Sequence, residues 1–269
     1  MNIASYMAII RLRFMLLVQY RVAALAGIAT QFLFGFVKVM ILEAFYLSTT
    51  APQPLSLKQA IGYVWLGQAM LGMLPWNGDG DVQALIRNGN VAYELCRPLD
   101  LYNQWYARAM AQRTAPTLLR AIPLFLVTLF VLPERYSLPI PPSVGALAAW
   151  VLAIFGALLL GCAITNLMNI SMLWTISGEG ASRLIPAVVL AFSGMVVPLP
   201  LFPDWAQGVL RVLPFAGLVD TPSRFFIGHL APDQIWMFLS RQLIWTAILV
   251  ACGRWILARG LKRVVIQGG

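Results

Sequence analysis

Asn77, Asp79 and Asp81 offer side-chain oxygens at alternating positions, the spacing of the first, third and fifth ligands of a calcium-binding EF-hand loop. Such a loop also needs a glycine at its sixth position and a bidentate glutamate at its twelfth. Val82 and Asn88 occupy these two positions here. The sequence therefore predicts that these carboxylates do not bind calcium and that they serve another purpose.

Other residue types that catalyse reactions or bind metals are scattered along the chain. The three cysteines, Cys96, Cys162 and Cys252, are far apart and show no CxxC spacing, so they predict neither a disulfide framework nor a zinc site. His229 is the only histidine, and beside two phenylalanines it is expected to pack rather than to bind a metal. The chain has no Gly-Lys dipeptide and hence no phosphate-binding GxxxxGK[ST] loop. We therefore expect that the chain is not an enzyme and binds no cofactor itself.

The overall composition is that of a membrane protein. Hydrophobic residues make up 60% and charged residues 11% of the 269 residues, and the mean hydropathy is +0.78. These values predict an integral membrane protein whose surroundings are a lipid bilayer. The formal net charge of +9 comes from single arginines beside apolar stretches rather than from a dense basic face, so no nucleic-acid binding is expected.

Six apolar segments are candidate transmembrane helices. A span needs about 20 apolar residues, because the hydrocarbon core is about 30 Å thick and a helix rises 1.5 Å per residue. The second and fifth candidates are short by this measure. The candidates are residues 22–47, 59–76, 115–131, 144–165 or somewhat beyond, 184–197 and 235–257. We therefore expect an all-α, polytopic membrane protein with a single transmembrane domain over residues 1–269.

The placement of basic residues predicts the orientation of these segments. Residues 1–21 mix apolar side chains with arginines and are expected to form a helix at the membrane surface, with an ordinary flanking helix as the alternative. Most lysines and arginines, such as Arg13, Arg87 and Arg259, fall on one side of a six-span arrangement. The positive-inside rule therefore places both termini and residues 77–114 in the cytoplasm, and residues 198–234 outside an inner membrane.

The polar stretch after the second candidate span predicts short, sharply bounded helices. Asp79 and Asp81 can cap a helix N-terminus, and Gly89 can end that helix in the left-handed conformation. A second helix can run from there to Pro98, and Asp100 can cap a third that leads into the next span. A rigid, exposed helix of this kind is either a docking surface for a partner or an elbow between spans.

The segment after the fifth candidate span predicts a broken, re-entrant structure. Pro198, Pro200 and Pro203 end a helix only about 22 Å long, which is too short to reach the outer headgroups. Asp204 is the expected N-cap of a short amphipathic helix. That helix is expected to contain the apolar residues Trp205, Val209, Leu210 and Leu213.

Two charged residues fall inside or near the first candidate span. Lys38 lies about 24 Å from the cytoplasmic start of that span, so we expect its ammonium group to reach the outer headgroups by snorkelling, and the same for Glu43. A polar pathway or a subunit contact is the alternative. Gly62, Gly67 and Gly72 would allow close packing of the second candidate span at an interface.

Taken together, these features resemble the membrane subunit of bacterial ATP-binding-cassette exporters of the ABC-2 permease class. The resemblance extends over essentially the whole chain, and two stretches carry it. They are IRNGNVAYELCRPLDLYNQWYAR, residues 86–108, and FSGMVVPLPLFPDW, residues 192–205.

The resemblance implies a pair of permeases, either two copies or one copy with a related permease, that carries two cytoplasmic ATPase subunits. ATP and magnesium would bind to these ATPases. The polar stretch would be the coupling helix, which places Asp81, Val82, Leu85, Ile86, Arg87, Tyr93, Glu94 and Arg97 at or near the ATPase. A smaller contact would include Gly178 and Glu179, and an outer gate would include Met195, Leu201, Phe202 and Trp205.

The resemblance also implies a function. The chain would export a hydrophobic or amphipathic substrate, using ATP hydrolysed by the separate subunit, because the spans hold few charges. The alternative is a secondary carrier or channel that works without ATP, although the spans lack the paired acids of an ion-coupled relay. A membrane enzyme acting on lipids would need a cluster of acids, bases or metal ligands, which the sequence does not suggest.

Overall fold

The computed structural model of the protein describes residues 3–19, 21–174 and 179–263, and in these ranges every regular element is a helix. The predicted all-α class is therefore confirmed. The α-helices are α1 Ile3–Gln19, α2 Arg21–Ser48, α3 Leu57–Ala69, α4 Gly80–Arg87, α5 Val91–Leu95, α6 Leu101–Phe130, α7 Val144–Ser171, α8 Glu179–Phe192, α9 Asp204–Val212, α10 Asp220–Phe226 and α11 Ile235–Gly260. Short 3-10 helices are η1 Leu71–Met73, η2 Leu199–Leu201, η3 Pro214–Gly217, η4 Pro232–Gln234 and η5 Leu261–Arg263.

Four helices in the described chain are long and apolar enough to cross a membrane. They lie at Gly27–Ser48 in α2, at Leu101–Phe130 and Val144–Ser171, which are α6 and α7, and at Pro232–Gly260, which joins η4 and α11. The other two candidate spans form shorter helices. Residues 59–76 contain most of α3 and all of η1, whereas residues 184–197 contain the second half of α8 and the turn that follows it. Helix length thus supports a multi-pass protein without fixing the number of passes at six.

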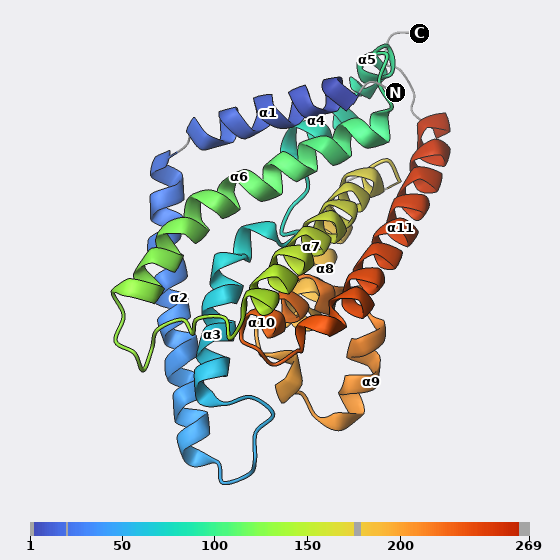
Figure 1. Ribbon diagram of the computed structural model, residues 1–269. Coiled ribbons are helices and arrows are strands. Elements are labelled where there is room, and N and C mark those ends of the chain that lie inside the picture. Colours follow the sequence, from blue (N-terminus) through green and yellow to red (C-terminus); the bar gives the residue numbers. More distant parts are fainter. Residues whose placement is uncertain (1–2, 20, 175–178, 264–269) are drawn as a thin grey trace.

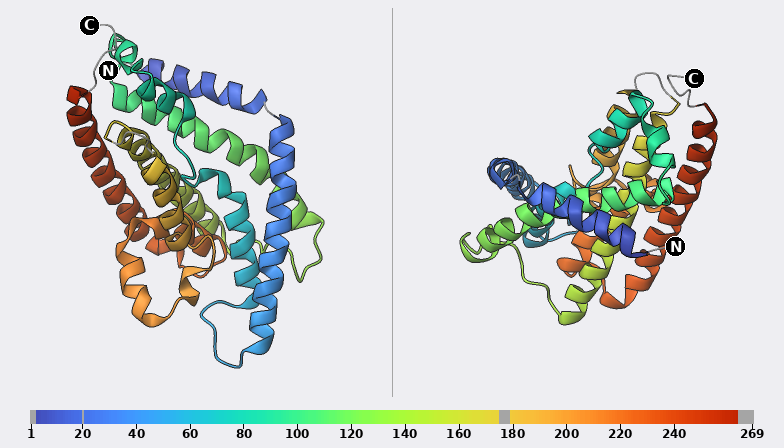
Figure 2. Two further views of the ribbon diagram at one scale, coloured as in Figure 1. Left: turned by 180° about the vertical axis from the view of Figure 1, so that it is seen from behind. Right: turned by 90° about the horizontal axis from the view of Figure 1, so that it is seen from above.

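The two ends of the molecule differ in construction (Figures 1 and 2). At one end α1 lies alongside the first half of α6, with α4, α5 and the end of α11 near them. From there α2 turns steeply away from α1, and α7 packs against α11. The short helix α9 and the loop between α2 and α3 lie at the opposite end. The polar stretch and the segment after α8 are therefore held apart by the long helices.

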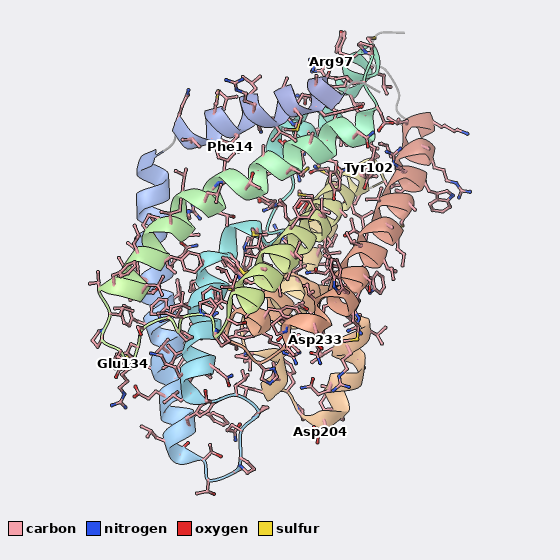
Figure 3. The ribbon with its side chains drawn as sticks, viewed as in Figure 1. Phe14, Arg97, Tyr102, Glu134, Asp204 and Asp233 are labelled. Carbon is pink, nitrogen blue, oxygen red and sulfur yellow. The ribbon has the colours of Figure 1, made fainter. Side chains whose placement is uncertain are left out.

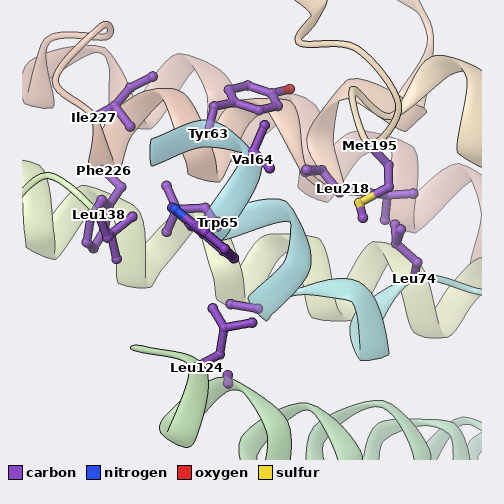
Figure 4. Packing of buried hydrophobic residues seen from close by; sticks show 14 of the residues in the cluster. Tyr63, Val64, Trp65, Leu74, Leu124, Leu138, Met195, Leu218, Phe226 and Ile227 are labelled. Atoms are coloured by element: carbon purple, nitrogen blue, oxygen red, sulfur yellow. The ribbon is translucent and has the colours of Figure 1, made fainter. Parts of the chain in front are cut away.

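The short helix α3 is surrounded by other helices, and this explains its apolar sequence. Ser56 caps it and Gln59 bonds back to Ser56, a capping box that fixes its start. Trp65 is fully buried, and its indole N–H donates to the carbonyl of Tyr136 at 2.8 Å. A Cβ atom at Gly35 in α2 would lie 2.4 Å from the Trp65 ring, so this close packing requires glycine there. Figure 4 shows Trp65 among the buried side chains of this core.

A tight turn follows α8 and contacts α3. Gly194 has φ of +87°, and a Cβ atom there would lie 2.0 Å from the hydroxyl oxygen of Tyr63. That hydroxyl donates to Asp220 at 2.9 Å, and the backbone N–H of Asp220 donates to the carbonyl of Ser193 at 3.1 Å. The turn, α3 and α10 are therefore joined through one buried set of hydrogen bonds.

Changing Gly194 to alanine is expected to destabilise the protein. The left-handed backbone alone costs about 1–2 kcal/mol for a residue with a Cβ atom, and Tyr63 would also have to move. Gly208→Ala is the matched control, because Gly208 lies within α9 and a Cβ atom there would meet nothing within 4 Å. In a helix this control is expected to be neutral or to stabilise by up to about 1 kcal/mol. Thermal unfolding in detergent measures both; equal losses of stability would contradict the argument.

The predicted cap of α9 is wrong by one residue. Asp204 is the first residue of the helix, and Pro203, with an extended backbone, occupies the cap position without a side-chain hydrogen bond. Proline at this place fixes the entry of the chain, and the Asp204 carboxylate lies in the first turn, where the helix dipole favours a negative charge. Leu210 is buried, whereas Trp205 and Val209 face outward.

Candidate functional site

The polar stretch forms the short helices that its sequence predicts. The Asp79 carboxylate caps α4 by accepting from the backbone N–H groups of Asp81, at 3.0 Å, and of Val82, at 3.4 Å. Gly89 has φ of +70° and ends that helix. After α5, the Asp100 carboxylate caps α6 by accepting from the N–H of Asn103 at 2.9 Å. These local predictions are confirmed.

An ion cluster joins α4 to α1 and α6. The Asp79 carboxylate, whose side chain is 1% exposed, accepts from the Arg108 guanidinium at 2.8 and 3.0 Å and from Arg13 at 3.2 Å. Asp81 lies within 2.7 Å of Arg13 and 3.0 Å of Arg108. We refer to Asp79, Asp81, Arg13 and Arg108 as the ion cluster. The two carboxylates rejected as calcium ligands are thus bound by two arginines.

The Asp79 carboxylate stays charged at neutral pH. Burial by itself raises the pKa of the Asp79 carboxyl, but the hydrogen bond and charge of Arg108, together with the charge of Arg13, outweigh it. The net effect holds the pKa of Asp79 below its usual value. The carboxylate is therefore ionised throughout the physiological range, and both arginines keep their partner.

The start of α4 is also fixed to α7. The backbone N–H of Asp79 donates to the Asn169 side chain at 2.9 Å, and Gln112 donates to the carbonyl of Gly78 at 3.3 Å. A Cβ atom at Gly78 would lie 2.3 Å from the ends of both the Asn169 and the Gln83 side chains, so any other residue there would displace them and disturb the bond to Asn169. The start of α4 is therefore bound to α1, α6 and α7, and a displacement of α4 must be transmitted to these helices.

Two of the predicted ATPase-contact residues point into the protein. Val82 is fully buried in an apolar cluster with Val91, Leu101, Tyr102, Trp105, Ile170 and Leu257. Glu94 is 8% exposed; it accepts a hydrogen bond from Gln104 and forms an ion pair with Arg97 at 3.3 Å. Both residues hold α4 and α5 on α6. Ile86 is half-buried against the same apolar cluster, and Leu85 is half-buried as well.

The remaining predicted contact residues form an outward surface. The side chains of Asp81, Arg87, Tyr93 and Arg97 are exposed, and that of Tyr93 is 74% exposed. Leu95, which is not among the predicted contact residues, is 51% exposed in the same short helix as Tyr93. We refer to these five residues as the α4–α5 face, which lies at one end of the molecule near Arg97 in Figure 3. Gly178 lies outside the described residues, and Glu179 is the first residue of α8.

The predicted gate residues fall into different surroundings. Met195 is 7% exposed and packs in the main core cluster. Leu201 is half-buried, and Phe202 packs against the separate cluster of Leu199, Ala206 and Leu210. Trp205 is 82% exposed. Met195 is thus a core residue, whereas Trp205 has the most exposed side chain of the four predicted gate residues.

The predicted snorkelling of Lys38 is wrong. Its ammonium group donates to the carbonyl of Met195 at 2.6 Å and so joins α2 to the turn after α8. The end of a helix leaves backbone carbonyls without intrahelical partners, and a nearby lysine can satisfy one of them. Glu43 forms an ion pair with Arg135 and accepts from the Tyr136 hydroxyl at 3.2 Å.

Lys38→Met is therefore expected to lower the stability of the protein. A hydrogen bond that involves a charged group contributes about 1.5–3 kcal/mol, and its loss would leave the Met195 carbonyl without this donor. Lys262→Met is the control, because Lys262 is exposed and a surface substitution changes stability by about 0.5 kcal/mol or less. Thermal unfolding in detergent measures both variants. An unchanged midpoint for Lys38→Met would show that the bond does not hold the turn.

Comparison with known protein families matches residues 32–268 to the family described as ABC-2 family transporter protein. No curated protein and no solved structure matches the chain. The matched region includes α3 to α11 and most of α2, and therefore the whole α4–α5 face. The helix α1, which supplies Arg13 to the ion cluster, precedes it.

Proposed function

We propose that this chain, which belongs to the ABC-2 transporter family, exports a hydrophobic or amphipathic substrate and is driven through its α4–α5 face by a separate ATPase. Membership of the family makes the chain the membrane-spanning permease component of an ABC transporter. Such a component has no ATPase domain of its own and works with an ABC ATPase subunit. The finer points of the proposal are the coupling surface, the topology and the pairing of permeases.

The observation that carries the coupling proposal is the anchoring of α4. Its outward side presents Asp81, Arg87 and, on the adjacent α5, Tyr93 to a partner. Its inward side is fixed by the ion cluster and by Asn169 to three long helices. An exposed helix with rigid inward attachments can convert a push at the surface into a movement of the spans. An elbow without a partner would not require an exposed tyrosine and leucine.

Six passes with both ends of the chain in the cytoplasm complete the proposed topology. The helices α3 and α8 have 13 and 14 residues, about 20 Å each, and would cross the hydrocarbon core with the help of the turns that follow them. The helices α4 and α5 and the last turns of α11, which carry the exposed residues Arg87, Arg254 and Arg259, lie at the same end of the molecule (Figure 1). This concentration of arginines favours the inner membrane, with that end in the cytoplasm.

The proposed transport cycle needs two permeases and two ATPases. ATP would draw the two ATPases together, and each would push the α4–α5 face of one permease. The force would pass through the ion cluster to α1 and α6 and through Asn169 to α7. The permease pair would then shift between a state open to the cytoplasm and a state open to the outside. The second permease is either another copy or a related chain.

Purification of the tagged chain from its native membrane in mild detergent tests this function. Mass spectrometry should identify an ABC ATPase at equal stoichiometry, and a second permease in the same complex would distinguish a heterodimer from a homodimer. If no ATPase is recovered, and crosslinking in intact cells also captures none, the coupling proposal fails. Transport driven by an ion gradient alone would then support a secondary carrier.

A further inference from the structure

A cavity of about 610 Å³ lies between the segment after α8 and the first turns of α11. Its walls come from η2, α9, η3 and α10 on one side and from residues 234–245 on the other. It lies toward the end of the molecule marked by Asp204 in Figure 3, away from the α4–α5 face. Pockets that bind small molecules commonly have volumes of about 300–1,000 Å³.

The walls of the cavity are held in place by hydrogen bonds. The Gln242 side chain donates to the carbonyls of Gly217, at 2.7 Å, and Ala153, at 3.0 Å, which ties η3 and α7 to α11. The Trp245 indole donates to the carbonyl of Val212 at 3.0 Å and joins the end of α9 to α11. Because these contacts cross between its walls, the cavity is a built feature of the fold and not a gap between loosely packed segments.

Three arginines line the cavity, and one of them, Arg224, already has an acidic partner within the protein. Arg224 donates to the buried carboxylate of Asp220 at 3.3 Å and to the Nδ1 atom of His229 at 3.1 Å. The other Asp220 oxygen accepts from Tyr63 at 2.9 Å. Arg224 and Asp220 therefore form an ion pair in the wall of the cavity. His229 accepts a hydrogen bond from Arg224 and adds no charge.

The other two arginines remain for a ligand. Arg211, from α9, and Arg241, from α11, have no acidic partner within ion-pair distance among the described residues. The Arg241 guanidinium lies 5.7 Å from the centre of the Phe238 ring, over an apolar wall. A guanidinium that lines a cavity favours an oxyanion such as a phosphate or a carboxylate, two oxygens of which it can bind through parallel hydrogen bonds.

Besides the arginines, the lining holds the Asp204 carboxylate and several uncharged polar side chains, and one part of it is apolar. Leu213, Met237 and Phe238 face the same cavity as the two arginines. Arg241 is six residues after the start of α11, about 9 Å along the helix. In the topology proposed above, the first turns of α11 lie on the outer side of the membrane, so the cavity would be open to outer-leaflet lipids. Charge and apolar surface therefore lie side by side within one cavity, as an amphiphile with a charged head and apolar groups next to it requires.

We propose that this cavity binds the anionic, phosphate-bearing head of an amphiphile through Arg211 and Arg241, with the first apolar groups of the ligand against Leu213, Met237 and Phe238. This inference goes beyond the proposed function, because it assigns a ligand class to an outer site within a single permease. It relies on the proposed topology only for the membrane leaflet that supplies the ligand.

Binding to the purified permease in non-ionic detergent tests the proposal, with dioctanoyl phosphatidylglycerol as the probe. The double variant Arg211→Gln/Arg241→Gln should bind this lipid at least tenfold more weakly than the unmodified chain. Arg135→Gln is the matched control: it removes an exposed arginine that pairs with Glu43 instead of lining the cavity, and binding should be unchanged. The thermal midpoint of each variant shows whether the fold is intact.

Two further probes separate the possible sources of the anion. Dioctanoyl phosphatidylcholine, with the same chains but no net charge, should bind more weakly than phosphatidylglycerol, and inorganic phosphate at equal concentration should not displace the lipid. Equal binding of the two lipids, full displacement by inorganic phosphate, or an unchanged affinity of the double variant would each overturn the proposal. No ATPase is present in these binding measurements, so a negative binding result would not affect the coupling proposal. Conversely, failure to recover an ATPase with the purified chain would not affect the lipid-binding result.

Discussion

Asp79→Asn is expected to destabilise the protein by about 3 kcal/mol, near the lower end of the cost of removing one partner from a buried ion pair. The substitution keeps a side-chain oxygen that can cap α4, but it leaves Arg13 and Arg108 without the buried carboxylate that they share. The lower end of the range applies because both arginines retain some exposure and still have Asp81. The variant should also lose ATP-driven transport, because α4 would no longer be fixed to α1 and α6.

Asp81→Asn is the matched control for this prediction. Its carboxylate binds the same two arginines, but its side chain is 62% exposed, and exposed ion pairs contribute about 0–1 kcal/mol. Thermal unfolding of both variants in one detergent measures the stability difference, and substrate transport in liposomes containing the ATPase measures coupling. Equal midpoints for the two variants would show that burial of Asp79 does not govern the strength of the cluster.

Tyr93→Asp is expected to weaken the association with the ATPase by about 30-fold or more, since a tyrosine at the centre of an interface commonly contributes 2 kcal/mol or more to binding. The side chain is 74% exposed, so the substitution should leave the fold of the permease intact. An aspartate would replace the apolar ring and place a negative charge on the surface that docks. Stimulated ATP hydrolysis and transport should fall together with association.

Trp205→Asp provides the control, because Trp205 is also an exposed aromatic residue, at 82%, but lies in α9 at the opposite end of the molecule. This variant should retain the ATPase on affinity purification. The half-buried Ile86 is less suitable for such a test, because a charge there would disturb the apolar cluster beneath α4 as well as any contact with the ATPase. Full ATPase association of Tyr93→Asp would remove α5 from the proposed contact.

The local form of the polar stretch was determined by the sequence alone. A helix cap depends on residues within three or four positions, so Asp79 and Asp100 could be recognised from their neighbours. A left-handed helix end depends on one glycine, here Gly89. The apolar composition likewise determined the membrane class, and the short second and fifth segments already differed from full spans.

Only the tertiary structure decided what these local elements contact. Arg13 and Arg108 are 66 and 29 residues from Asp79, and each is a plausible cytoplasmic arginine when the sequence is considered alone. Lys38 and Met195 are 157 residues apart, and the bond between them depends on how α2 packs against the turn after α8. The sequence could not supply these pairs, because a charged side chain has many possible partners until the packing of the helices selects one.

The same reason explains why the sequence did not distinguish the buried side of α4 and α5 from their exposed side. Val82 and Tyr93 are both apolar enough to dock on a partner, and both were expected at the ATPase. Burial of Val82 and exposure of Tyr93 follow from the orientation of α4 and α5 on α6 and α7. Residue types and spacing determined that helices form here, whereas long-range packing, with its many alternatives in an unfolded chain, determined which of their faces remains available.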